Sequence, residues 1–202
     1  NPKSEMSGVI VGLVAEFLNV PREVAPLIDL ALGDKAEQFI GRDAQQLDQL
    51  LTRRDKPFPG RVSFLPLVPM EPLSEGDETA TADRWVTCDH PELLGLPRQL
   101  LGNVRIVPDL MTARSMAADP EFVGYRFITR QGELIDTDGT LTVGTHHAEA
   151  GILSRKSELR ALHAQVTGLE NEIAAAESAI ANWKQQIDSL DAPIHGLDQE
   201  IA

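Results

Sequence analysis

The sequence predicts a mixed α/β domain followed by one long coiled-coil helix. Three observations lead to this fold class. Short apolar runs alternate with helical patterns up to about residue 150, Gly and Pro punctuate that region, and regularly spaced apolar residues with a single further Pro follow it. The change in texture near residue 150 divides the chain into a globular part and a rod.

The rod is predicted from an uninterrupted heptad pattern. Apolar residues recur at alternating steps of three and four, which is the a/d seam of a coiled coil. The seam comprises Leu159, Leu162, Val166, Leu169, Ile173, Ala176, Ile180, Trp183, Ile187, Leu190, Ile194, Leu197 and Ile201. So narrow a stripe requires a partner helix, and we expect it to pair with the rod of another copy or to fray. Pro193 is expected to bend or end the helix, because it lacks a backbone donor.

The first half of the globular part, residues 8–70, is predicted from turn residues and apolar runs. Asp43 has the side chain of a helix N-cap, and Gly33 is placed to end the preceding helix. The expected elements are a buried strand over 8–18, a helix over 21–33, a strand over 38–41, a helix over 43–51 and a strand over 61–65 that Pro66 ends.

The second half, residues 84–150, is predicted in the same way, and the two halves share a similar arrangement of strands and helices. The segment between them, 71–83, is acidic and small, so we expect a solvated connector. The expected elements of the second half are a helix over 97–101, a strand over 104–107, a helix over 110–118 capped by Asp109, a hairpin of 125–129 and 133–135, and a closing strand over 141–143. Residues 1–7 are expected to be a remnant of an incoming segment or a tag, and 151–202 to be the rod.

Composition excludes several classes of protein. The formal charge is −13, with 18 basic against 31 acidic residues, which opposes a dedicated nucleic-acid binder. No apolar run approaches the roughly 18 residues of a membrane span, and the first residues lack the basic and apolar regions of a signal peptide. The one cysteine, Cys88, excludes an internal disulfide and favours a reducing cytoplasm.

Gly60-Arg61-Val62-Ser63-Phe64-Leu65-Pro66-Leu67 is the most specific motif of the globular part. It resembles the G-R-x-T-F-L-P-L motif in the hinge of structural maintenance of chromosomes (SMC) proteins, with Ser63 in place of the usual Thr. Further segments resemble that hinge in the same order: 8–15, 31–33, 100–107, 130–135 and 151–159. The resemblance covers about residues 8–165 and is strongest to the bacterial chromosome-partition proteins.

The resemblance implies an SMC hinge fold of two related subdomains, which dimerises at the tip of a long antiparallel coiled coil. The implied partners are a second copy and the incoming helix of the same full-length chain, within an ATPase that organises and segregates chromosomal DNA in the cytoplasm at the nucleoid. No phosphate-binding G-x-x-x-x-G-K-[ST] motif occurs. We therefore expect an excised fragment without ATPase heads, with no enzyme activity and no cofactor of its own.

The same resemblance places the dimer interface near the end of the second half. The family pattern is approximately P-G-G-x-L-T-G-G, and Asp138 and Val143 replace two of its glycines here, so the interface is expected to be altered or weaker. Without the resemblance, Gly139 is more simply interpreted as a turn residue after Asp138. The expected interface residues are Gly139, Thr140, Leu141, Thr142, Val143 and Gly144.

Two basic clusters are candidate DNA contacts, because some hinges of this family and their adjacent coils bind DNA. The first cluster is Arg53, Arg54, Lys56 and Arg61, and the second is Arg155, Lys156 and Arg160. The simpler interpretation is a solvated helix end, where Arg53 and Arg54 complement the helix dipole. The acidic composition favours this interpretation.

Two further arrangements suggest chemistry and are set aside. His146 and His147, with Glu149 and His90, invite a metal hypothesis, but adjacent side chains of an extended segment point to opposite sides. Cys88 and His90 suggest a thiol–imidazole pair, yet no orienting group is evident and a lone Cys is usually a small hydrophobe. Two alternatives stay open: an α/β domain that binds a small molecule and oligomerises through its rod, and a coiled-coil adaptor whose head binds a protein.

Overall fold

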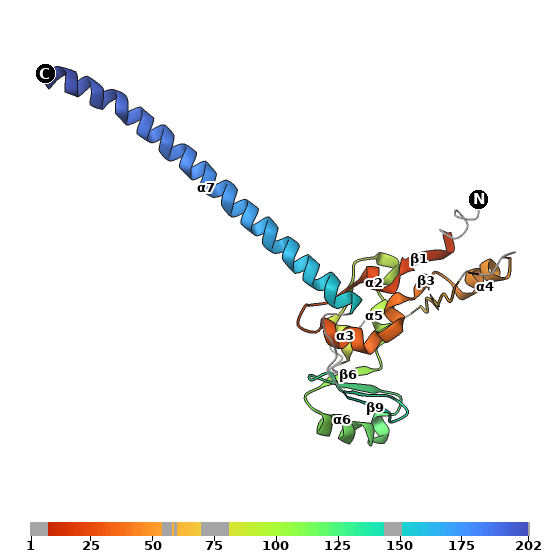
Figure 1. Ribbon diagram of the computed structural model, residues 1–202. Helices are drawn as coiled ribbons and strands as arrows, with labels where there is room; N and C mark the ends of the chain where they lie inside the picture. Colours follow the sequence, from red (N-terminus) through yellow and green to blue (C-terminus); the bar gives the residue numbers. More distant parts are fainter. Residues whose placement is uncertain (1–7, 54–57, 59, 70–80, 144–150, 202) are drawn as a thin grey trace. The chain divides into compact units, whose positions relative to one another are not determined.

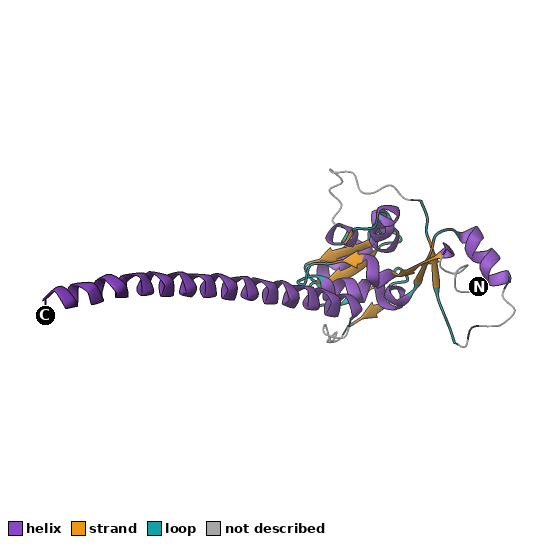
Figure 2. Ribbon diagram, turned by 90° about the horizontal axis from the view of Figure 1, so that it is seen from above, coloured by secondary structure: helices purple, strands orange, loops and turns teal. Residues whose placement is uncertain are grey.

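The structure is a computed structural model that describes residues 8–53, 58, 60–69, 81–143 and 151–201, with side chains of the last helix described to residue 190 and at Pro193. The chain forms two compact units, Asn1–Glu158 and Leu159–Ala202. The first unit contains three small sheets and several short helices (Figure 1; Figure 2). The second unit continues a long helix.

A three-stranded sheet organises the first half. Its central strand, β3 (Phe39–Gly41), is antiparallel to β1 (Ile10–Leu13) and parallel to β4 (Phe64–Pro66). Between the parallel strands runs α4 (Ala44–Thr52), and Asp43 caps it by accepting the backbone N–H of Gln45, as predicted. β4 begins later than expected and includes Pro66, which is tolerated because β4 is an edge strand.

The predicted single strand over 8–18 is wrong. β1 is followed by a four-residue helix, α2 (Val14–Phe17), and by β2 (Leu18–Asn19). Val14, Ala15 and Leu18 are all buried, so the apolar run fills the core although its backbone changes conformation twice. Apolar periodicity alone cannot separate a buried strand from a short buried helix. The next helix, α3 (Ala25–Leu32), starts later than predicted and ends at Gly33, whose φ is 50°.

The second half contains a four-stranded sheet in the order β6-β7-β8-β9. β6 (Val104–Val107) and β7 (Arg126–Thr129) are parallel, and β8 (Leu134–Ile135) and β9 (Leu141–Thr142) continue the sheet antiparallel. α5 (Leu96–Leu101) precedes β6, and α6 (Leu110–Ala117), capped by Asp109, connects β6 to β7. These elements confirm the predicted helices, hairpin and closing strand.

Apolar side chains point alternately to the two faces of this sheet, and both faces are buried. Val107, Phe127 and Ile135 pack in a cluster with Ala113 of α6. Their neighbours on the opposite face, among them Val104, Ile128 and Leu134, belong to the main core. The sheet is therefore a layer between α6 and the main core.

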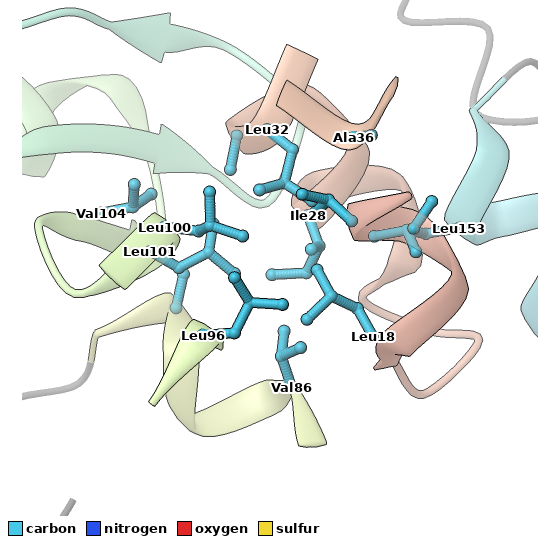
Figure 3. Close-up of a cluster of buried hydrophobic side chains, with 14 of the residues drawn as sticks. Leu18, Ile28, Leu32, Ala36, Val86, Leu96, Leu100, Leu101, Val104 and Leu153 are labelled. Carbon is cyan, nitrogen blue, oxygen red and sulfur yellow. The ribbon is translucent and has the colours of Figure 1, made fainter. Parts of the chain in front are cut away.

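The main core joins residues of both halves to the start of the last helix (Figure 3). Ile28 and Leu32 of α3 pack in one cluster with Leu96 and Leu101 of α5 and with Leu153. A second link is the pairing of β2 with β5 (Thr87–Cys88). Cys88 is buried there, as expected of a small hydrophobe, and burial raises the pKa of its thiol.

The expected solvated connector is wrong for its last three residues. Thr81, Ala82 and Asp83 are buried. Thr81 forms a β-bridge with Arg105 of β6, and a 3₁₀ helix, Ala82–Trp85, begins directly after it. The chain thus joins the fold before the acidic composition ends, and the rest of the predicted connector, 71–80, lies outside the described residues.

The rod is confirmed as one helix, α7 (Ile152–Ile201). It continues through Pro193, so the helix does not end there, because one missing backbone donor does not terminate a 50-residue helix. The alternative that Pro193 bends the helix stays a prediction. Seam side chains from Leu159 to Leu190 are exposed, with Trp183 at 63%. Pairing of this seam stays a prediction. In the described part of the chain, no helix is long and apolar enough to cross a membrane.

Replacing Asp109 with Asn tests the cap of α6. The backbone N–H of Thr112 donates to the Asp109 carboxylate at 2.8 Å, and this bond lowers the pKa of the carboxyl group. A lowered folded-state pKa stabilises the protein above the unfolded pKa of about 4, and this contribution disappears as the pH falls through the folded value. We expect urea unfolding to show wild type more stable than Asp109→Asn at pH 7, with the difference shrinking below about pH 4. An equal difference at pH 7 and pH 3 would contradict the cap.

Candidate dimerisation edge

β9 is an edge strand of the four-stranded sheet. The opposite edge strand, β6, is bridged by Thr81, whereas no other described strand pairs with the outer side of β9. The backbone N–H of Asp136 donates to the carbonyl of Thr140. By the alternation of an antiparallel ladder, the N–H and C=O of Leu141 then point away from β8. Such an edge is a template for a strand of another chain.

A glycine turn leads into this edge. Gly139 has φ of +84°, and no atom lies within 4 Å of the position that a Cβ would take, so backbone conformation rather than crowding selects glycine. Its N–H donates to the carbonyl of Asp136, and the N–H of Thr140 donates to the Asp138 carboxylate at 2.8 Å. Hydrogen bonds from the hydroxyl and the backbone of Thr140 lower the pKa of Asp138. Asp138, where the family pattern has glycine, therefore helps to close the turn.

The side chains along β9 differ in what they contact. Leu141 packs against the cluster under α6, while Thr140, Thr142 and Val143 are exposed. Val143 is 61% exposed and is the apolar side chain that the described edge presents to solvent. Gly144, the last of the predicted interface residues, lies outside the described residues.

Four of the predicted DNA contacts are exposed arginines. Arg53 and Arg61 are exposed, and Arg155 is exposed on the first turns of α7. Arg160 is exposed in the second unit. Arg54 and Lys56 lie outside the described residues.

Lys156 points into the protein rather than toward solvent. Its ammonium donates to the backbone carbonyls of Ala15 at 3.0 Å, Glu16 at 2.5 Å and Leu18 at 3.0 Å. An ammonium group has three protons to donate. Lys156 therefore has no proton left for a phosphate in this conformation.

The metal hypothesis finds no site in the part of the chain that the structure describes, and for the thiol hypothesis the structure shows a buried Cys88 whose pKa that burial raises. His146, His147 and Glu149 lie outside that part of the chain, and the described residues contain no group of three or more metal-binding side chains. The ring of His90 stands edge-on to Phe17, with 5.6 Å between ring centroids. This contact orients the ring against the aromatic side chain.

A surface hollow of about 380 Å³ bears on the small-molecule alternative. Its lining includes Arg42, Leu67, Glu92 and Leu96. The two charged residues of this lining, Arg42 and Glu92, form an ion pair with each other. They are therefore engaged within the protein and do not point to a ligand.

Comparison with known families decides between the alternatives. The family model described as "SMC proteins Flexible Hinge Domain" matches residues 6–117. The chain belongs to this family. It is 35% identical over 183 residues to the chromosome partition protein Smc of Rhodopirellula baltica, covering 86% of this chain and 15% of that protein. The corresponding protein of Myxococcus xanthus is 33% identical over 176 residues, covering 81% and 14%.

Solved SMC hinges share the fold. An asymmetric dimer of the Geobacillus stearothermophilus hinge matches with a TM-score of 0.72 and 27% identity, covering 89% of this chain and 76% of that one. A Pyrococcus furiosus hinge with an extended coiled coil matches with a TM-score of 0.54 and 26% identity, covering 88% and 68%. The predicted family and the mixed α/β hinge followed by a long helix are confirmed. The chain spans only a small part of the length of the Smc proteins.

Asp29 is a structurally important residue that was not predicted from the sequence. It is a buried acid inside the apolar run of α3. An acidic residue within such a run was the available signal, because burying a carboxylate requires compensating hydrogen bonds. Those bonds come from residues far along the chain, which the sequence alone does not place nearby.

Replacing Gly139 with Ala tests the turn before β9. A side chain at φ of +84° is strained, so we expect a loss of roughly 1 kcal/mol in the free energy of unfolding. Gly60→Ala is the matched control, because Gly60 also has open space at its Cβ position but no positive φ in the strained range. Equal stabilities of the two variants by denaturant unfolding would count against the turn.

Proposed function

We propose that the chain is the homodimerisation hinge of an SMC ATPase that organises and segregates chromosomal DNA, with its ATPase heads outside the chain. The role is architectural: two copies join at their hinges and carry coiled-coil arms. The outer edge of β9, with which no other described strand pairs, is the observation that carries this proposal. The solved asymmetric dimer of the Geobacillus stearothermophilus hinge supports it. We infer a cytoplasmic, nucleoid-associated location and no cofactor from the same role.

Residues 139–144 are the proposed interface. Pairing of β9 with a strand of the second copy would satisfy the outward backbone groups of Leu141 and cover the exposed Val143. The proposal keeps the two subdomains, 8–70 and 84–150. In support, both halves place an Asp-capped helix between two parallel strands, β3–α4–β4 and β6–α6–β7.

The exposed seam of α7 is the proposed surface for the second arm helix. Seam side chains from Leu159 to Leu190 are 48–63% exposed where given, which is far more than a stable apolar stripe tolerates alone. In a full-length chain the partner is the incoming helix, antiparallel to α7. In the present chain, the seam of another copy is the available substitute.

Val143→Lys tests the interface. A charged side chain at an edge opposes pairing with a second strand, so we expect the dimer dissociation constant to rise at least about tenfold. Val123→Lys is the matched control, since Val123 is also an exposed valine, at 82%, but follows the 3₁₀ helix Pro120–Phe122 and is not part of β9. Sedimentation equilibrium measures both.

The measurement needs a form without the arm, because exposed seams also associate. We place the cut after Glu158 rather than at Gly151, since Leu153 is 1% exposed and belongs to the main core. If Val143→Lys in this shortened chain dimerises as tightly as Val123→Lys, the interface lies elsewhere.

DNA contact is a second, subordinate proposal. It is supported by the exposure of Arg155 on the first turns of α7 and of Arg53 and Arg61 in the first half. The net charge of −13 opposes it, so binding would be confined to such local basic positions. Lys156 is not among the proposed contacts, because its ammonium is engaged inside the protein.

Arg155→Glu tests the DNA contact. Reversing one charge at a phosphate contact should weaken binding to a duplex and reduce its salt dependence. Arg114→Glu is the control, because Arg114 is exposed on α6 and outside the two basic clusters. Fluorescence anisotropy at two salt concentrations measures both. Equal binding of Arg155→Glu and Arg114→Glu would remove Arg155 from the contact.

A further inference from the structure

The last helix begins on a carboxylate that the first half supplies. Asp29 of α3 accepts the backbone N–H of Leu153 at 3.0 Å and that of Ser154 at 2.8 Å. The hydroxyl of Ser154 donates to the same carboxylate at 2.5 Å. These are first-turn donors of α7, which have no partner within a helix. A negative charge at this end also complements the helix dipole. Asp29 therefore caps a helix that starts 123 residues later in the sequence.

The approach of the two segments requires a glycine. A Cβ added to Gly151 would lie 1.9 Å from Oδ2 of Asp29 and 2.7 Å from its Cβ. The side chain of Asp29 cannot move far enough to make room for this Cβ and still accept the hydrogen bonds of Leu153 and Ser154. Gly151 thus lets the chain pass directly over Asp29 as the helix begins.

A second polar contact lies farther along the same helix. The ammonium of Lys156 donates to the carbonyls of Ala15, Glu16 and Leu18, at the end of α2 and the start of β2. The carbonyl end of a helix carries partial negative charge, which a cation stabilises. Leu153, whose own N–H donates to Asp29, is 1% exposed in the main core. A negative group thus holds the first turn of α7, where Leu153 is also buried, and a positive group holds the next turn.

Both polar contacts fasten α7 to the first half, although α7 follows the second half in the chain. β9 ends at Thr142 and α7 begins at Ile152, so the backbone alone would carry any pull on the arm directly to β9. The contacts of Asp29 and Lys156 provide another route, into α3 and α2.

We propose that Asp29 and Lys156 are positioning residues, which lock the root of α7 to the first half and so keep load on the arm away from β9. This inference rests on the proposed function, because only an arm-bearing hinge carries such a load. The contacts of Asp29 and Lys156 lie within one chain, so they can be tested separately from dimerisation.

The first experiment measures local opening in the 202-residue chain by amide hydrogen exchange. Asp29→Asn nearly preserves the shape but removes the charge, and Lys156→Met preserves the stem but removes all donors. We expect the amides of Leu153 and Ser154 to exchange roughly tenfold faster in each variant, the change that loss of one helix cap gives. Exchange at Ile128, buried in the second sheet, should stay unchanged. Asp34→Asn is the control, since Asp34 is exposed.

The second experiment reads the arm itself. Spin labels at the exposed positions 34 and 165, in a chain with Cys88→Ala, report the distance distribution between the first half and α7. We expect the distribution to broaden in Asp29→Asn and in Lys156→Met. Lys156→Arg, which keeps donors at this position, should restore part of the narrow distribution. A distribution of unchanged width in both charge-removing variants overturns the proposal.

Two glycine substitutions on α7 distinguish loss of the contact with Asp29 from a general change in helix stability. Gly151→Ala forces a methyl group onto Asp29, while Gly168→Ala adds one in open space on the same helix. Only Gly151→Ala should broaden the distribution; broadening by both, or by neither, contradicts the lock. Sedimentation of the same samples reports dimerisation separately, so a monomeric wild type would refute the proposed function while leaving the test of Asp29 and Lys156 readable.

Discussion

Burial of one apolar cluster shared by both halves is the constraint on which the rest of this structure depends. Ile28 and Leu32 have no separate core to fill in the first half; they pack with Leu96 and Leu101 of the second and with Leu153 of the last helix. Removing any one of these surfaces would expose the other two to water. The arrangement of the two halves and the position of the root of α7 therefore depend on this one cluster, while Leu141 of β9 packs in the second cluster, under α6.

Local chemistry was predicted from the sequence where a residue acts on its immediate neighbours. Asp43 and Asp109 cap the helices that directly follow them, and Gly33 ends the helix directly before it. Such signals need only a few residues of context. The division of the run over 8–18 was not predictable in this way, because a buried helix of one turn and a buried strand both require only apolar side chains.

Long-range polar contacts were beyond local inference for a different reason. Lys156 was assigned to a basic DNA-binding cluster from its neighbours in sequence, but the carbonyls that it binds are about 140 residues away. Asp29 and Thr81 also contact residues that are not their neighbours in sequence. The bridge from Thr81 to Arg105 covers one edge of the second sheet, and β9 forms the other edge. The candidate interface was found only because a family resemblance carried information that spacing and charge do not contain.

The unequal sizes of the seam residues on α7 have a consequence for how arms fit together. Ala176 and Trp183 occupy equivalent seam positions one heptad apart, and Trp183 is 63% exposed. A partner helix must place a large side chain opposite Ala176 and small side chains opposite the indole of Trp183, because knobs and holes have to match in volume. Sliding by seven residues would set the indole against the bulk meant for the alanine. The sizes of these two side chains therefore favour one register between α7 and its partner helix.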